Sequence, residues 1–254
     1  MISSSSPSLK SAWSTALGRG IDARSLGVGV EVVGGLDPCG IDNDPIAHLS
    51  ILFELADKFD RGIDIHLHDS GELGLWQIAR IIDFTERYQR QGRVMISHAF
   101  CLGMKNWAQV LPLAERLAAN RISLMTTAPA DIAIPPFAEL LCAGVNVCLG
   151  SDGIRDAWTP MGNGDMLERA MLLAFRCGMR TDAEICAAFE AAASNGARAL
   201  GRSDYGLATG QTANLLLLPA ETLSEAVVAR PLARTVISRG IVVAKNGSLL
   251  QSRL

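Results

Sequence analysis

The residues able to do chemistry gather at the ends of short apolar runs. His66 and His68 end one run, Asp69 follows them directly, and His98 and Asp152 end two later runs. Imidazole and carboxylate groups suit zinc, iron or manganese, and a catalytic site of this kind keeps one position for water. The metal lowers the pKa of that water to about 7, and a further carboxylate moves the proton. These residue types therefore indicate metal-assisted hydrolysis.

Strand-like runs alternate with longer helix-like ones, which predicts an α/β fold with a parallel sheet. Each strand-like run is apolar almost throughout, as in strands buried on both faces. In a parallel barrel the carboxyl ends of the strands lie on one face, so we expect His66, His98 and Asp152 to share one mouth. The expected strands span 28–33, 63–67, 94–97, 122–126 and 145–149, and the expected helices 45–59, 72–90, 107–119 and 182–200.

The composition excludes several classes of protein. With 254 residues, 49% hydrophobic and 19% charged, the chain is long enough for a large domain with a buried core. The net charge is −3 and Lys and Arg do not cluster, which argues against nucleic acid or a membrane surface as partner. No apolar stretch approaches the roughly 20 residues of a membrane helix, and the start lacks a signal-peptide apolar region. We therefore expect a cytoplasmic protein with a small, weakly charged partner.

The fourth histidine and the cysteines fit structural roles better. His48 lies inside a helical pattern, which favours a surface histidine or a hydrogen-bonded core histidine. The six cysteines are scattered and form no CxxC pair. They indicate reduced core residues rather than disulfides or a thiolate metal site.

The C-terminal part of the chain changes character. A turn-rich segment at 204–210 precedes strand-like runs at 213–218 and 234–245, and Arg239-Gly240 splits the second run as in a hairpin. This pattern predicts a small antiparallel β appendage. The expected organisation is an unassigned N-terminal segment at 1–25, the C-terminal part of a hydrolase barrel at 26–203 and the β appendage at 204–254.

Four segments together carry a resemblance to a known family. They are GIDIHLHDSGELG, VMISHAF, NVCLGSDGIRDAWTPMGNGDML and YGLATGQTANLLLLPAE. In order and spacing they resemble the bacterial cytosine deaminase branch of the amidohydrolase superfamily, and also the N-isopropylammelide amidohydrolases of triazine degradation. The resemblance covers 26–247. It implies a (β/α)8 barrel of the TIM type, with one divalent metal ion, zinc or iron, at its C-terminal face.

The resemblance also implies roles for individual residues. His66 resembles the fifth-strand metal ligand, with His68 as the alternative ligand. Asp152 resembles the eighth-strand ligand that also takes a proton from the attacking water. His98 resembles the sixth-strand histidine that hydrogen-bonds this water or occupies a second metal position. Asp69 stands where cytosine deaminases carry a glutamate that protonates the ring nitrogen.

Two further residues and two departures concern the substrate and the completeness of the site. Asp156 and Trp158 resemble a loop that packs over a planar heterocycle, and an ordinary surface turn is the alternative. Asp69 is one methylene shorter than the family's glutamate, which argues against cytosine itself. The family's first strand ends in a His-x-His pair that supplies two ligands, and no such pair precedes Gly34. We therefore expect an N-terminally truncated, partial barrel that alone need not retain its metal.

Two interpretations of function stay open. The first is a metal-dependent hydrolase that cleaves a C–N bond of a cytosine-like or amino-triazine heterocycle and is incomplete in this chain. The second is a non-catalytic remnant or subunit that needs missing N-terminal strands from another polypeptide. The apolar edges of a partial barrel favour association, so we expect a homo-oligomer. The other nucleobase deaminase architecture is disfavoured, because its H-x-E and P-C-x-x-C signature is absent.

Overall fold

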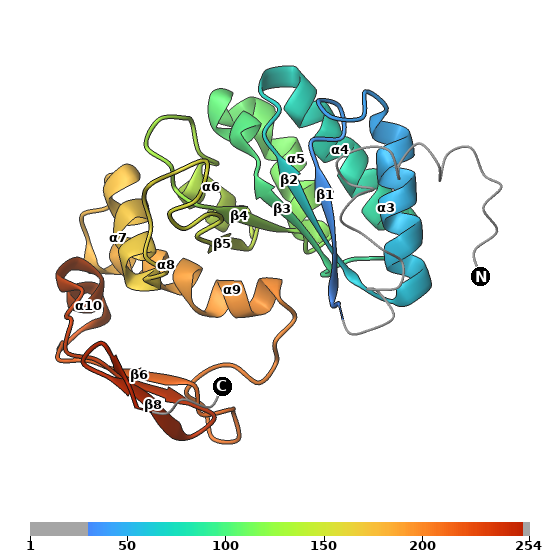
Figure 1. Cartoon of the computed structure of the whole chain (residues 1–254). Coiled ribbons are helices and arrows are strands. Elements are labelled where there is room, and N and C mark those ends of the chain that lie inside the picture. The colour runs from blue at the N-terminus through green and yellow to red at the C-terminus, as the bar shows by residue number, and fades with distance from the viewer. Residues whose placement is uncertain (1–29, 251–254) are drawn as a thin grey trace. The chain divides into compact units, whose positions relative to one another are not determined.

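The computed structural model describes residues 30–250 (Figure 1). The chain divides into two compact units between Val147 and Cys148. The expected domain boundary between residues 203 and 204 falls inside the second unit and stays a prediction. The expected N-terminal segment at 1–25 lies outside the described residues.

The first unit contains most of a parallel sheet, whose last strand crosses the boundary between the two units. The strand order is β1-β2-β3-β4-β5, and each neighbouring pair from β1 to β4 runs parallel. Helices α3, α4 and α5 lie along one side of these strands (Figure 1). This arrangement, with the separate antiparallel sheet described below, confirms the predicted α/β fold class. The strands are β1 (Val32–Leu36), β2 (Gly62–Leu67), β3 (Val94–His98), β4 (Ser123–Thr126) and β5 (Val147–Leu149).

Helices connect the strands and cover them with apolar side chains. The expected bounds of α3 and α5 are confirmed. Each helix begins after a residue whose side chain caps it: Asp44 accepts a hydrogen bond from Ala47 N, and Asn106 accepts one from Gln109 N. Full burial of a large apolar side chain contributes about 1.5–3 kcal/mol, so the repeated apolar faces hold the helices to the sheet. The connecting elements are α3 (Pro45–Phe59), α4 (Gly71–Arg87), the 3₁₀ turn η1 (Phe100–Met104), α5 (Trp107–Ala119) and α6 (Phe137–Cys142).

The first strand lies further along the chain than expected. The prediction was 28–33, whereas pairing with β2 starts at Val32 opposite Gly62 and continues to Leu36. Two glycines made this stretch look unlike a strand. A Cβ at Gly35 would lie 3.0 Å from Leu52 and 3.1 Å from His48, so glycine allows α3 to pack closely on β1 without a shift of these side chains.

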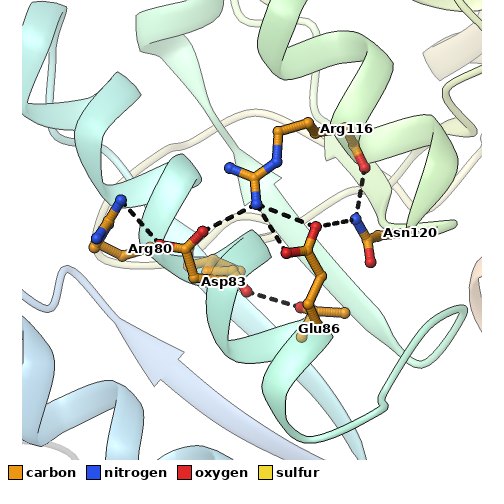
Figure 2. Close-up of polar contacts among 7 residues, drawn as sticks. Arg80, Asp83, Glu86, Arg116 and Asn120 are labelled. Atoms are coloured by element: carbon orange, nitrogen blue, oxygen red, sulfur yellow. Dashed lines mark hydrogen bonds and ion pairs between the residues drawn. The ribbon is translucent and has the colours of Figure 1, made fainter.

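Polar contacts join neighbouring helices of the first unit at their outer surface. Arg116 of α5 binds Asp83 and Glu86 of α4 at 2.9 and 3.0 Å, as Figure 2 shows. Glu86 also accepts a hydrogen bond from Asn120 Nδ2 at 2.8 Å, and Arg80 pairs with Asp83 at 2.9 Å (Figure 2). This network links α4 to α5, two helices that lie about one strand–helix repeat apart in the sequence.

The second unit combines helices with a small antiparallel sheet of order β6-β7-β8-β9. The predicted β appendage is confirmed, and its hairpin turns at Arg239 and Gly240, which have φ of 50° and 80°. Two consecutive positive φ values are typical of the tight turn that joins twisted strands. The elements are α7 (Met166–Arg176), α8 (Asp182–Ala192), α9 (Ser194–Ala199), β6 (Leu215–Leu217), α10 (Leu223–Ala229), β7 (Thr235–Ser238), β8 (Ile241–Lys245) and β9 (Ser248–Leu249).

Two expectations about this region and the cysteines need correction. The single helix expected at 182–200 is two helices, because the backbone leaves helical geometry at Ala193 (φ −125°, ψ −96°). All six cysteines are free, but Cys142 and Cys177 are exposed rather than part of the core, since both lie at helix ends. Within residues 30–250, no helix has the length and apolar character needed to cross a membrane.

Candidate functional site

Three histidines meet where β2 and β3 end. His66 and His98 lie at the ends of these neighbouring strands, and His68 follows β2 directly. Nδ1 of His66 is 3.2 Å from Nε2 of His98. Each of the three offers a ring nitrogen, and these nitrogens lie within 4.8 Å of one another. We call these residues the histidine cluster.

The backbone of β3 turns sharply to place His98 in the histidine cluster. In a regular strand His98 would face the same side as its register partner Leu67, which is fully buried. Instead His98 and Ala99 adopt left-handed conformations, with φ of 72° and 48°. The His98 ring thereby stacks on that of His68, with centroids 4.4 Å apart. Such backbone strain costs about 1–3 kcal/mol per residue and persists where the surroundings hold it.

A carboxylate just after β1 orients His68. Asp37 accepts two hydrogen bonds from His68, one from the backbone N at 2.7 Å and one from Nδ1 at 2.8 Å. Burial alone would raise the pKa of Asp37, but these hydrogen bonds outweigh it and hold the pKa below its usual range. Because Nδ1 carries the proton toward Asp37, Nε2 is the nitrogen of His68 that can bind a metal or exchange a proton.

Asp69 is held from the side of α4. Its Oδ2 accepts a hydrogen bond of 2.7 Å from Nε2 of Gln77, a side chain with no exposed surface. The other end of the Gln77 amide accepts from the backbone N of Cys39 at 3.2 Å. Cys39 follows β1 and Asp69 follows β2, so Gln77 joins two strand-end loops.

A second carboxylate, that of Asp64, lies two residues before His66 on β2. Asp64 accepts a hydrogen bond of 2.8 Å from Ser97 Oγ on β3. Its Oδ2 lies 4.0 Å from Nε2 of His66. Asp64 therefore places a carboxylate near the imidazole of His66, as is common around histidines that bind metals.

Three further residues of this site, Asp37, Gln77 and Asp64, were not predicted from the sequence. Asp37 follows a strand, as the predicted site residues do, so the same rule could have found it. Gln77 is a polar residue on the apolar face of a helix, where Ile78 and Ile81 are also buried. A buried polar side chain of this kind needs hydrogen-bond partners, and that need was the signal available in the sequence.

The remaining predicted site residues belong to the second unit. Asp152 follows β5 with a left-handed φ of 57°, and its role as a ligand stays a prediction. Asp156 accepts hydrogen bonds from the backbone N of Trp158 at 2.9 Å and of Thr159 at 3.1 Å. This turn leaves Trp158 91% exposed. A Cβ at Gly153 would lie 1.9 Å from Oδ2 of Asp156, so a larger residue there would displace the Asp156 side chain from this turn.

The histidine cluster has the donor set that a divalent transition metal requires. Imidazole nitrogens suit zinc and iron, and their mutual spacing allows one ion to reach all three. Ligating histidines usually donate their other ring N–H to a carboxylate or carbonyl, as His68 does to Asp37. His48 stands apart from this arrangement. It is a buried residue of α3 whose Nδ1 donates to Asp42 at 2.6 Å, in agreement with the structural role expected for it.

The model of the amidohydrolase family matches residues 8–244. The chain belongs to the amidohydrolase family. It is 32% identical over 227 residues to the N-isopropylammelide isopropyl amidohydrolase of Pseudomonas sp. (strain ADP), a match that covers 88% of this chain and 56% of that protein.

Two solved structures resemble this amidohydrolase chain. One is N-isopropylammelide isopropylaminohydrolase from Burkholderia multivorans, with a TM-score of 0.88, 43% identity, and coverage of 90% of this chain and 58% of that one. The other is 5-methylcytosine deaminase from Klebsiella pneumoniae, with a TM-score of 0.77, 27% identity, and coverage of 91% and 60%. These relatives confirm the predicted branch of the family. The amidohydrolase chain spans just over half the length of each of them.

Proposed function

We propose that this chain carries part of the active site of a metal-dependent hydrolase that removes an amino group from a nitrogen heterocycle. The observation that carries the proposal is the histidine cluster, with Asp69 next to His68 in the chain. In the reaction a hydroxyl group from water bonds to a ring carbon, the C–N bond breaks, and the amine leaves with a proton. The site must therefore activate water and deliver a proton to nitrogen.

One histidine and one aspartate of this chain would hold the metal. We assign His66 and Asp152 as ligands, with His68 as the alternative to His66. The orientation of His68 by Asp37 supports the alternative, since it leaves Nε2 available. Zinc or iron bound there would supply an acidified water, with a pKa of about 7. Asp64 would hold His66 in place through its proximity to Nε2.

Three side chains would interact with the water and its protons. His98, whose ring is fixed by the turn after β3, would accept a hydrogen bond from the attacking water or provide a second metal position. Asp69 passes the proton on to the ring nitrogen or the leaving amine, and Asp152 takes the proton first released from water. Positioned acid–base groups of this kind contribute about 10²-fold to 10⁴-fold in rate.

We propose an amino-triazine in preference to cytosine as the substrate class. Asp69 is one methylene shorter than the glutamate of cytosine deaminases. It would therefore suit a substrate whose ring or substituent lies closer to the backbone of this residue. The higher identity to the isopropylaminohydrolase than to the deaminase supports this preference. Trp158, exposed beyond the Asp156 turn, offers a flat surface that would cover a planar ring.

The test is turnover by the metal-loaded chain. The purified protein would be loaded with zinc, or with Fe²⁺ without oxygen, and assayed for amine release from N-isopropylammelide and for ammonia release from cytosine. We expect faster amine release, and loss of both metal and turnover in His66→Ala. His48→Gln is the matched control outside the site and should keep its metal. A chain that binds metal without turnover would instead support the non-catalytic subunit. Cytoplasmic location and a homo-oligomer also stay predictions, testable by fractionation and light scattering.

A further inference from the structure

The start of α4 packs unusually closely against the strand-end loops. A Cβ at Gly74 would lie 2.2 Å from the backbone O of Asp69 and 2.6 Å from Cβ of Cys101. Only glycine allows this approach, because both obstacles are parts of the chain that cannot easily move. Gln77 lies three residues later, on the same face of the helix as Gly74. The close approach at Gly74 therefore brings the Gln77 side chain within hydrogen-bonding distance of the Asp69 carboxylate.

The chemistry of its partners fixes the orientation of the Gln77 amide. The backbone N–H of Cys39 can only donate, so it must face Oε1 of Gln77, at 3.2 Å. Nε2 then faces Oδ2 of Asp69 at 2.7 Å, with the backbone O of Leu73 at 3.5 Å as a weaker partner. An amide buried without partners is costly, and here both ends are satisfied. The orientation with Nε2 toward Asp69 is thus the stable one.

This hydrogen bond makes the two oxygens of Asp69 different. An aspartate carboxylate otherwise rotates over a broad range about its last torsion. Gln77 holds Oδ2, whereas Oδ1 lies toward Gly40, where even an added Cβ would remain 3.8 Å away. The glycine leaves room beside Oδ1. A catalytic side chain must be held to within about 0.5 Å of its productive position, and such support comes from neighbours that are themselves fixed.

We propose that Gln77 is a positioning residue that holds Oδ2 of Asp69, so that Oδ1 is the oxygen that carries the proton. The inference rests on the proposed proton-transfer role of Asp69. Gln77 touches neither the substrate nor the metal in this scheme and acts only through Asp69. A purely structural role, bracing the loops after β1 and β2, would lower stability without a selective effect on the chemical step.

Two substitutions and a matched control separate these roles. Gln77→Met removes both hydrogen bonds, while Gln77→Glu keeps an acceptor for the Cys39 N–H and, in its ionised form, removes the donor to Asp69. Thr85→Val is the control, because Thr85 is another fully buried polar side chain of α4. Its Oγ1 donates to the backbone O of Ile81 at 2.8 Å, within the helix and with no link to Asp69.

We expect both Gln77 variants to lower kcat about 10-fold to 100-fold, as loss of an outer partner of a site residue does. KM, metal content and the absorption spectrum of the cobalt-substituted protein should stay as in the parent, and Thr85→Val should keep its kcat. In the Asp69→Asn background, Gln77→Met should cause no further loss, because coupled residues are not additive.

A readout without turnover completes the test. The side-chain amide signals of Gln77, assigned in a ¹⁵N spectrum by their loss in Gln77→Met, should shift in Asp69→Asn and not in Thr85→Val. Unshifted signals would overturn the inference. So would an unchanged kcat in both Gln77 variants when Asp69→Asn is impaired. If Asp69→Asn itself keeps full turnover, the proposed role of Asp69 fails instead. Should Gln77→Met not fold, the isosteric Gln77→Glu decides the kinetic arm.

Discussion

The two ends of α4 carry polar networks of opposite character. Near its start, Gln77 is fully buried and forms hydrogen bonds to two strand-end loops. Near its end, Asp83 and Glu86 meet Arg116 with side chains 38–45% exposed (Figure 2). Exposed ion pairs contribute about 0–1 kcal/mol, whereas a buried polar group must be fully paired. The exposed network of Asp83, Glu86 and Arg116 is therefore expected to matter less for function than the buried hydrogen bonds of Gln77.

The largest effect is expected at the buried end, in Asp69→Asn. Turnover of an amino-triazine should fall about 10²-fold to 10⁴-fold, because a positioned proton carrier is lost. Metal content should not change, since Asp69 is not assigned as a ligand. Steady-state kinetics with elemental analysis of the same sample measures both. Unchanged turnover would remove Asp69 from the mechanism and leave His98 or His68 as the proton carrier.

Asp69→Glu sharpens the same comparison, because it changes only the length of the acidic side chain. The longer acid should raise activity on cytosine relative to that on bulkier N-alkylated rings. The ratio of kcat/KM for the two substrates is the quantity to measure. An unaltered ratio would mean that the length of this side chain does not set the substrate class.

A smaller effect is expected when the orienting carboxylate of His68 is removed. Asp37→Asn should weaken zinc binding about 10-fold to 100-fold if His68 is a ligand, as loss of a histidine's carboxylate partner does. Asp42→Asn is the matched control, because Asp42 forms the same kind of pair with His48 away from the histidine cluster. Competition with a chelator gives both affinities. Equal zinc affinities in the two variants would assign the ligand role to His66 rather than His68.

His48 should make a modest contribution to the pH dependence of stability. Burial lowers the pKa of its imidazole, and the nearby Asp42 offsets this only in part. The unfolded chain therefore takes up the proton first, near the ordinary pKa of about 6.5, so stability falls as pH decreases through that value toward the folded pKa. Urea unfolding on both sides of this range should show a flatter pH profile for His48→Leu. Parallel profiles would contradict the prediction.

The smallest effect belongs to the exposed end of α4. Arg116→Ala should lower the free energy of unfolding by no more than about 1 kcal/mol, since its partners are solvated. Turnover and metal content should match the parent protein. Urea unfolding with kinetics on the same preparation tests both statements. A loss of turnover here would show that the two ends of α4 are coupled, and would break the comparison.

Much of the site was predictable because the strand-end rule applies wherever buried strands run parallel. It brought His66, His68 and His98 together correctly, since the apolar runs before them leave no doubt about the strands. Asp37 is harder to assign to the site, because Asp followed by Pro is also a common turn signal. Gln77 was missed because its partners, 8 and 38 residues away, are defined only by the packing of α4 at Gly74.

The left-handed turn after β3 has a consequence for engineering. Glycine accepts such backbone angles freely, so Ala99→Gly would relieve the cost that Ala99 carries at φ 48°. The same change would free the peptide that aims the His98 ring at its two neighbours. Stability and a fixed orientation of the His98 ring thus make opposite demands on one residue, and selection for greater stability at position 99 would loosen the histidine cluster.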